Sequence, residues 1–128
     1  MTQIAVDDGS ARQLGQNTIL VVDDDEDIRE ALRDVLGDEG FNVILASNGK
    51  VALGLLSSLR RPCGIILDVT MPIMGGVELY HAMRAVPDLA DIPVLFLTSD
   101  PFTAPGGVPM VGKSVSLDRL LGTVAELF

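Results

Sequence analysis

The sequence Ile65-Ile66-Leu67-Asp68-Val69-Thr70-Met71-Pro72 combines a short apolar run with one carboxylate and a proline. The apolar residues, rich in β-branching, predict a short buried strand. Pro72 opposes simple continuation of that strand, so Asp68 is expected where the strand opens into a loop. A charge beside a buried strand is costly unless another group pairs with it. Asp68 is therefore either a cap for the next helix or a reactive carboxylate with partners from elsewhere in the chain.

The composition fits one globular domain and argues against several classes of partner. The chain has 128 residues, 48% of them hydrophobic, which is enough for a substantial core. Its formal net charge of −9 argues against nucleic-acid binding, because phosphate backbones require a basic surface. Cys63 is the single cysteine, so no disulfide can form within the chain, and we expect a buried, inert thiol.

The chain carries no pattern typical of membrane insertion or export. No run approaches the ~18 apolar residues that a membrane span needs, and the N-terminus does not resemble a signal peptide. We therefore expect a soluble, cytoplasmic protein with no membrane partner. Residues 1–17 lack sustained periodicity, which predicts a flexible N-terminal tail before a domain at 18–128. No output domain follows, so both a stand-alone regulator and a piece of a larger protein remain open.

Apolar runs alternate with amphipathic helical patterns along the domain. The predicted strands are 18–22, 41–46, 64–67, 92–98 and 108–112. The predicted helices are 28–37 (or to Gly40), 48–59, 77–86 and 116–128. An acidic run precedes the first helix, where the helix dipole favours negative charge, and we interpret Asp25, Glu26 and Asp27 as solvated charges.

This alternation predicts a parallel α/β sheet with helices on both faces. In such sheets, ligands bind beyond the carboxyl ends of the strands, where the winding reverses. The residues that follow or end the predicted strands there are Asp23, Asp24, Asp68, Thr98 and Lys113. We expect these five to converge at one edge of the sheet.

The five residues suit phosphoryl chemistry. Neighbouring carboxylates repel each other, and a hard divalent cation such as Mg²⁺ removes that repulsion. A carboxylate can accept a phosphoryl group and form an acyl phosphate. The transfer requires positioning and neutralisation of the phosphoryl oxygens, which a metal ion, an ammonium and a hydroxyl can supply.

At these residues the sequence resembles the receiver domain of bacterial two-component response regulators. The similarity covers about residues 18–128 and rests on four pieces in order: Ile19-Leu20-Val21-Val22-Asp23-Asp24, then Ile66-Leu67-Asp68 with Met71-Pro72, then Leu97-Thr98-Ser99, then Lys113. The resemblance implies a flavodoxin-like fold, with a five-stranded parallel sheet of order 2-1-3-4-5 and helices on both faces.

The resemblance also implies a role for each site residue. Asp68 would accept phosphate from a sensor histidine kinase or a histidine phosphotransfer protein. Thr98 would hydrogen-bond the phosphoryl group and Lys113 would pair with it. Such a protein is not a conventional enzyme, because it catalyses phosphotransfer to itself and its own dephosphorylation. The implied Mg²⁺ ligands are Asp68, Asp24, Asp23 (largely through water) and the backbone carbonyl of Thr70.

The sequence departs from the family pattern in three places. Ser114 follows Lys113 where the family usually has proline, and Met110 replaces the aromatic residue that swings on activation. Residues 99–107 are too few for an average helix of ~11 residues with its loops, and they contain two prolines and two glycines. We predict that the family's fourth helix is reduced or replaced by a Pro/Gly loop, and that the output uses a different surface.

Two functions from different classes remain open. The first is a phosphorylatable switch acting on an unidentified downstream protein, which the acid pair, Asp68, Thr98 and Lys113 favour. The second is a pseudo-receiver, a constitutive protein-interaction module without switching, which Met110 and the short 99–107 segment favour. A haloacid-dehalogenase-like phosphatase is a third reading, but Asp68-Val69-Thr70 lacks the second aspartate of those enzymes.

Overall fold

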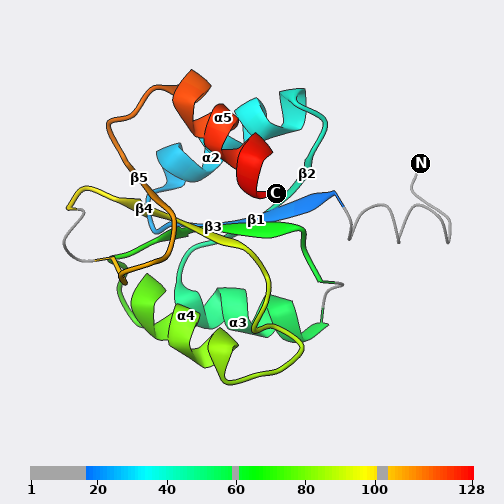
Figure 1. Cartoon of the computed structure of the whole chain (residues 1–128), viewed down its shortest axis with the longest axis vertical. Helices are drawn as coiled ribbons and strands as arrows, with labels where there is room; N and C mark the ends of the chain where they lie inside the picture. Colours follow the sequence, from blue (N-terminus) through cyan, green and yellow to red (C-terminus); the bar gives the residue numbers. More distant parts are fainter. Residues whose placement is uncertain (1–16, 59–60, 101–103) are drawn as a thin grey trace, which may run out of the picture.

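Five short apolar strands form the centre of the computed structural model, which describes residues 17–58, 61–100 and 104–128 (Figure 1). The strands are β1 (Thr18–Val22), β2 (Asn42–Ala46), β3 (Gly64–Asp68), β4 (Val94–Thr98) and β5 (Met110–Gly112). Every residue of β1, β3 and β4 is buried. Strands covered on both faces have no solvent side, which is why their sequences are continuous apolar runs.

The strands pair in parallel in the order β2-β1-β3-β4-β5. This confirms the predicted five-stranded sheet of order 2-1-3-4-5. The chain moves outward from β1 to β2 and then returns to β3 on the other side of β1, so the winding reverses between β1 and β3. Val22 pairs with Leu67, which places Asp23 and Asp68 beside each other at the carboxyl edge.

Two helical layers cover the sheet, as Figure 1 shows. Helices α2 (Glu26–Asp38) and α5 (Leu117–Leu127) lie on one face, and α3 (Gly49–Ser58) and α4 (Gly76–Arg84) lie on the other. Alternate strand residues belong to the two cores: Ile19 packs in the α2/α5 cluster and Leu20 in the α3/α4 cluster. The period of two along each strand therefore fills both interfaces.

Side-chain caps set the starts of three helices. Asp25 caps α2, with its carboxylate accepting from the amide of Asp27 at 2.9 Å. The side-chain oxygen of Asn48 accepts from Val51 N at 2.9 Å at the start of α3, and Ser116 caps α5. Asp25 is thus more than a solvated charge, because it satisfies amides that the first helical turn leaves without partners.

The predicted elements are present, but several of their ends are shifted. The helix expected at 77–86 begins at Gly76 and ends at Arg84. The strand expected at 92–98 begins at Val94, since Pro93 has no amide to donate to a neighbouring strand. Pro109 shortens the last strand from 108–112 to Met110–Gly112 in the same way.

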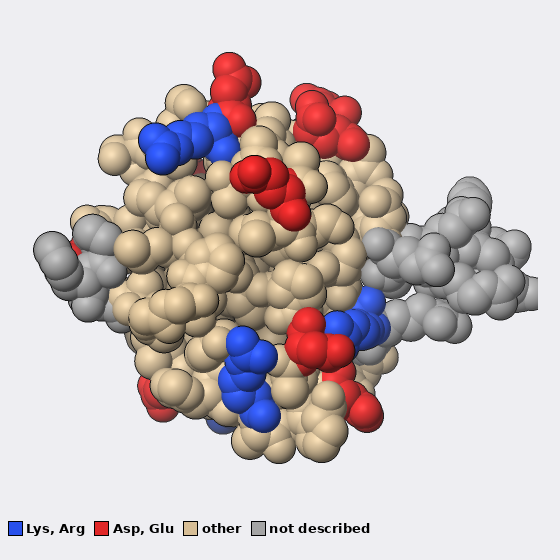
Figure 2. All heavy atoms as spheres, in the orientation of Figure 1, with Lys and Arg blue, Asp and Glu red and all other residues tan. Residues whose placement is uncertain are grey.

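The connection from β4 to β5 contains no helix in its described residues, 99–100 and 104–109. The rest of the expected Pro/Gly loop, 101–103, lies outside the described residues. A hollow of about 180 Å³ lies beside this connection, lined in part by Tyr80, Val94 and Val108. Figure 2 shows the molecule in the orientation of Figure 1. The surface over the region of β4 and β5 is uncharged in this view, and most charged side chains lie nearer its margin.

The expected N-terminal tail, 1–17, lies outside the described residues except for Asn17. The carbonyl of Asn17 accepts from Asn42 N at 3.0 Å, and its side-chain amide donates to the carbonyl of Gly40. Asn17, the one residue of the expected tail that the structure describes, is therefore hydrogen-bonded to the domain. Within the described ranges, no helix is long and apolar enough to cross a membrane.

The start of β3 packs against the last residue of the chain. A Cβ atom on Gly64 would lie 2.4 Å from a ring carbon of Phe128, so glycine is needed for this contact. Cys63 belongs to the same cluster but is only half-buried, less than expected from the sequence. Partial burial raises the pKa of its thiol.

Helix α4 begins directly against the end of β3. The amide of Gly76 donates to the carbonyl of Val69 at 2.9 Å. A Cβ atom on Gly76 would lie 2.1 Å from the carbonyl oxygen of Asp68, a distance that real structures do not allow. The absence of a side chain at Gly76 therefore lets α4 support the backbone of Asp68.

We predict that Gly76→Ala destabilises the fold by about 1–3 kcal/mol, because the added methyl group must push α4 away from β3. Gly54→Ala is the matched control: Gly54 is an exposed residue within α3, and an added Cβ meets nothing within 4 Å. The control should be neutral or stabilise by up to about 1 kcal/mol. Urea unfolding of the two variants measures this, and equal stabilities would contradict the packing argument.

Candidate functional site

Three carboxylates meet at the carboxyl edge of the sheet, where β1 and β3 end. Asp23 is 0% exposed and Asp68 is 2% exposed, whereas Asp24 is exposed to solvent. One oxygen atom from each of the three carboxylates lies within 4.8 Å of the others. The predicted convergence of the acid pair with Asp68 is present in the structure.

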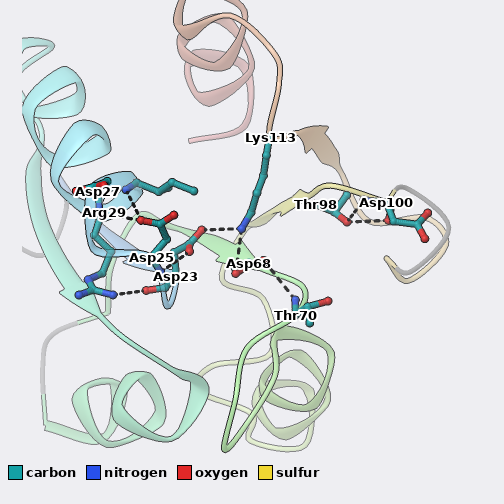
Figure 3. Close-up of polar contacts among 10 residues, drawn as sticks. Asp23, Asp25, Asp27, Arg29, Asp68, Thr70, Thr98, Asp100 and Lys113 are labelled. Carbon is teal, nitrogen blue, oxygen red and sulfur yellow. Dashed lines mark hydrogen bonds and ion pairs between the residues drawn. The ribbon is translucent and has the colours of Figure 1, made fainter.

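Lys113 brings a positive charge to this cluster from the end of β5 (Figure 3). Its amide donates to the carbonyl of Thr98 at 2.9 Å, which extends the β4–β5 pairing by one residue. Its Nζ atom lies 3.1 Å from Oδ2 of Asp68 and 3.3 Å from Oδ2 of Asp23. One ammonium therefore pairs with two buried carboxylates.

The electrostatic balance of the site raises the pKa of Asp68 above that of an ordinary carboxyl group. Burial first, and then the charge of the Asp23 carboxylate, raise the pKa of Asp68 to about 6, although Lys113 and the amide of Thr70 lower it in part. Burial lowers the pKa of Lys113, but the two carboxylates outweigh burial and raise that pKa above its ordinary value. Lys113 stays charged, and its single charge does not fully compensate both carboxylates.

The donor set fits a hard divalent cation. Oδ2 of Asp23 and Oδ2 of Asp68 are both buried, and both face the single ammonium of Lys113. Two buried carboxylates that share one positive charge are costly, and a cation lowers that cost. Mg²⁺ prefers carboxylate oxygens and retains several waters, which the exposed Asp24 side of the cluster allows. Asp23, Asp24 and Asp68 are therefore the residues that could hold such an ion.

The two threonines flank the cluster. The amide of Thr70 donates to Oδ1 of Asp68 at 3.3 Å, so the loop after β3 helps to orient the carboxylate. The hydroxyl of Thr98 donates to the Asp100 carbonyl at 2.7 Å and accepts from the Asp100 amide at 2.9 Å. Figure 3 shows Thr98 at the end of β4 with these contacts directed to Asp100. The phosphoryl contact of Thr98 and the metal contact of the Thr70 carbonyl remain predictions.

Two residues that the sequence analysis did not assign to the site also hold it together. The amide of Asp25 donates to Oδ1 of Asp23 at 2.9 Å. The guanidinium of Arg29 donates to the main-chain carbonyl of Asp23 at 2.6 Å. A signal for Arg29 was available: a cation in the first turn of a helix opposes the helix dipole, so its position there needs a specific partner.

We predict that Asp68→Asn stabilises the metal-free protein near neutral pH by about 1–3 kcal/mol, because it removes a buried charge. The Asp68 pKa rises from 3.8 to about 6 on folding, so between these values the native state retains a proton that the unfolded chain loses. Its contribution to stability therefore falls as pH rises through this window. Below this pH window, the difference in the free energy of unfolding between Asp68→Asn and the wild type should shrink.

Urea unfolding with a chelator, compared at several pH values, measures the effect. Asp91→Asn is a control of opposite sign, because the hydrogen bond and charge of Arg61 hold the pKa of this exposed carboxyl below its ordinary value. A variant at Asp68 that is less stable than wild type at neutral pH would show that the Lys113 pair outweighs the repulsion and burial.

Solved structures of similar proteins share this fold. The chemotaxis protein CheY4 of Vibrio cholerae is 30% identical with a TM-score of 0.79, covering 88% of this chain and 99% of its own. Response regulator TrrA of Thermotoga maritima, solved in complex with Mg²⁺-BeF, is 32% identical with a TM-score of 0.75, with coverages of 88% and 99%. The signal receiver domain of a histidine kinase from Syntrophus aciditrophicus is 33% identical with a TM-score of 0.79, with coverages of 86% and 88%.

Sequence comparisons agree with the structural ones. Response regulator MprA of Mycolicibacterium vanbaalenii is 46% identical over 81 residues, which are 63% of this chain and 34% of that protein. The chain thus spans about a third of the length of the curated relatives that it matches. Residues 19–121 match the family described as the response regulator receiver domain. With its parallel sheet and its cluster of carboxylates and lysine, the chain belongs to the response regulator receiver domain family.

Proposed function

We propose that this receiver domain is a phosphoacceptor switch in a two-component phosphorelay, with Asp68 as the acceptor. The observation that carries the proposal is the buried Asp68 carboxylate between Asp23 and Lys113, at the edge where the sheet winding reverses. The similarity to TrrA, which was solved in complex with Mg²⁺-BeF, supports a role for Mg²⁺ in this chain. A sensor histidine kinase or a histidine phosphotransfer protein is the proposed donor.

The proposed reaction transfers a phosphoryl group from a phosphohistidine to Asp68. An oxygen of the Asp68 carboxylate attacks phosphorus and forms a P–O bond, while the P–N bond breaks and its electron pair returns to the imidazole. Lys113, now 3.1 Å from Oδ2 of Asp68, would pair with the incoming phosphoryl oxygens. Hydrolysis then removes the phosphoryl group: water attacks phosphorus, the P–O bond to Asp68 breaks, and inorganic phosphate leaves as the Asp68 carboxylate is regenerated.

A bound Mg²⁺ would neutralise the carboxylates and the phosphoryl oxygens during this transfer. We assign its ligands to Asp23, Asp24 and Asp68, with the carbonyl of Thr70 completing the set. Asp23 would act largely through water. Its Oδ1 is already bonded to the amide of Asp25, and its Oδ2 faces Lys113.

Thr98 would bind the phosphoryl group after a change of partner. Its hydroxyl now donates to the Asp100 carbonyl, so a rotation of the side chain would be needed to redirect that proton to a phosphoryl oxygen. This exchange would connect phosphorylation of Asp68 to the segment after β4.

The output of the switch is proposed to use a surface other than a helix between β4 and β5, where the described residues contain none. Met110, at the position of the family's switching aromatic, is 43% exposed on β5. The presence of methionine at position 110 also favours the second candidate function, a constitutive interaction module. A flexible thioether does not have the two discrete positions of an aromatic ring. Partner binding that is equal with and without phosphate would identify the module.

We predict that incubation with Mg²⁺ and acetyl phosphate adds a single phosphoryl group to the wild-type chain, because the ionised Asp68 is the nucleophile of the site. Intact-mass analysis detects the adduct. It should be absent without Mg²⁺ and absent from Asp68→Asn. Asp91→Asn removes an exposed carboxylate that pairs with Arg61, outside the proposed site, and should be phosphorylated like the wild type.

The outcomes separate the two candidate functions. An adduct that persists in Asp68→Asn would refute Asp68 as the acceptor. If acetyl phosphate gives no adduct, phosphorylated histidine kinases and phosphotransfer proteins are tried as donors. Failure of both donor classes would refute the switch and leave the interaction module.

A further inference from the structure

Asp23 makes contacts through its amide, its carboxylate and its carbonyl, and the contact of the carbonyl has no role in the chemistry proposed above. Its amide donates to the carbonyl of Ala46 at the end of β2, at 3.1 Å. Its carboxylate accepts from the amide of Asp25 and pairs with Lys113. Its carbonyl accepts from the guanidinium of Arg29 at 2.6 Å, as Figure 3 shows.

The carbonyl contact controls the residue that follows. The carbonyl of Asp23 and the amide of Asp24 belong to one planar peptide unit, so fixing the carbonyl direction fixes the start of Asp24. Within the part of the chain that the structure describes, no hydrogen bond or ion pair holds the exposed carboxylate of Asp24. The position of that carboxylate in the cluster therefore depends on its backbone.

Arg29 is also in an unfavourable place for a simple surface cation. It lies in the first turn of α2, where the helix dipole disfavours positive charge. The carboxylates of Asp24 and Asp25 follow β1 directly. The part-buried guanidinium of Arg29 nevertheless donates to the neutral carbonyl of Asp23. A short hydrogen bond from a charged donor is stronger than one between neutral groups, and it holds the loop in one geometry.

We propose that Arg29 is a positioning residue of the cation site, which fixes the Asp23–Asp24 peptide and thereby presents the Asp24 carboxylate to the ion. The inference rests on the proposed Mg²⁺ site and adds a residue that touches neither the ion nor the phosphoryl group. It makes a prediction opposite in sign to simple electrostatics. Removing a nearby positive charge should by itself strengthen cation binding, whereas loss of positioning weakens it.

The test is calorimetric titration of Mg²⁺ into the wild type, Arg29→Met and Arg33→Met at one ionic strength. Arg33 is the matched control, because it is an exposed arginine on the same helix that pairs with Glu30. We expect Arg29→Met to raise the Mg²⁺ dissociation constant about tenfold. Arg33→Met should change it less than about twofold, towards tighter binding.

A second measurement needs no metal. In the Mg²⁺-free protein, hydrogen exchange at the amide of Asp25 should accelerate about tenfold in Arg29→Met, because the loop that holds its acceptor Asp23 is released. Exchange at buried Leu36 should match that of Arg33→Met, which separates a local effect from global loss of stability. If Arg29→Met does not fold, Arg29→Lys replaces it, because an ammonium lacks the planar guanidinium fork.

The outcomes distinguish this inference from the function on which it rests. Mg²⁺ binding to Arg29→Met as tight as to Arg33→Met, with unchanged exchange at Asp25, would overturn the positioning role and leave Arg29 as a surface charge. A wild-type protein that binds no Mg²⁺ would refute the proposed cation site. In that case the exchange measurement still decides whether Arg29 holds the loop.

Discussion

The burial of two neighbouring carboxylates is the constraint on which the rest of the site depends. Asp23 and Asp68 lie side by side because β1 and β3 pair in register, and both are almost completely buried. Lys113 offsets part of this charge, but the pKa of Asp68 still rises to about 6. Such an arrangement favours the binding of a cation, or of another group that neutralises the negative charge of the two carboxylates.

The surrounding fold supplies the rigidity that this site requires. Gly76 lets α4 begin against the carbonyl of Asp68, and Lys113 is held by its backbone pairing with Thr98. Asp23 is anchored through its amide, its carbonyl and its carboxylate. Chemistry that depends on charge placement gains most from such fixed groups, because little reorganisation is then needed during the reaction.

Strand period and strand ends are local features, and they were sufficient to predict a parallel sheet and the convergence of Asp23, Asp24, Asp68 and Lys113. The strand order came from the resemblance to receiver domains. The sequence could not predict the hydroxyl of Thr98 turning to Asp100, because side-chain rotation depends on the final loop. The position of Arg29 in the first turn of α2 indicated a specific partner, but the sequence could not show that this partner is the Asp23 carbonyl. Two strands begin later than the apolar pattern predicted, because Pro93 and Pro109 have no amide to donate to a neighbouring strand.

The central claim, a cation-dependent carboxylate nucleophile, is tested most directly by NMR titration of the Asp68 carboxyl carbon with and without Mg²⁺. The account predicts a pKa of about 6 in the metal-free protein and a clearly lower value when Mg²⁺ is bound, because the ion stabilises the ionised form. An Asp68 pKa that Mg²⁺ leaves unchanged, at saturating concentration, would contradict the claim that this carboxylate belongs to the cation site.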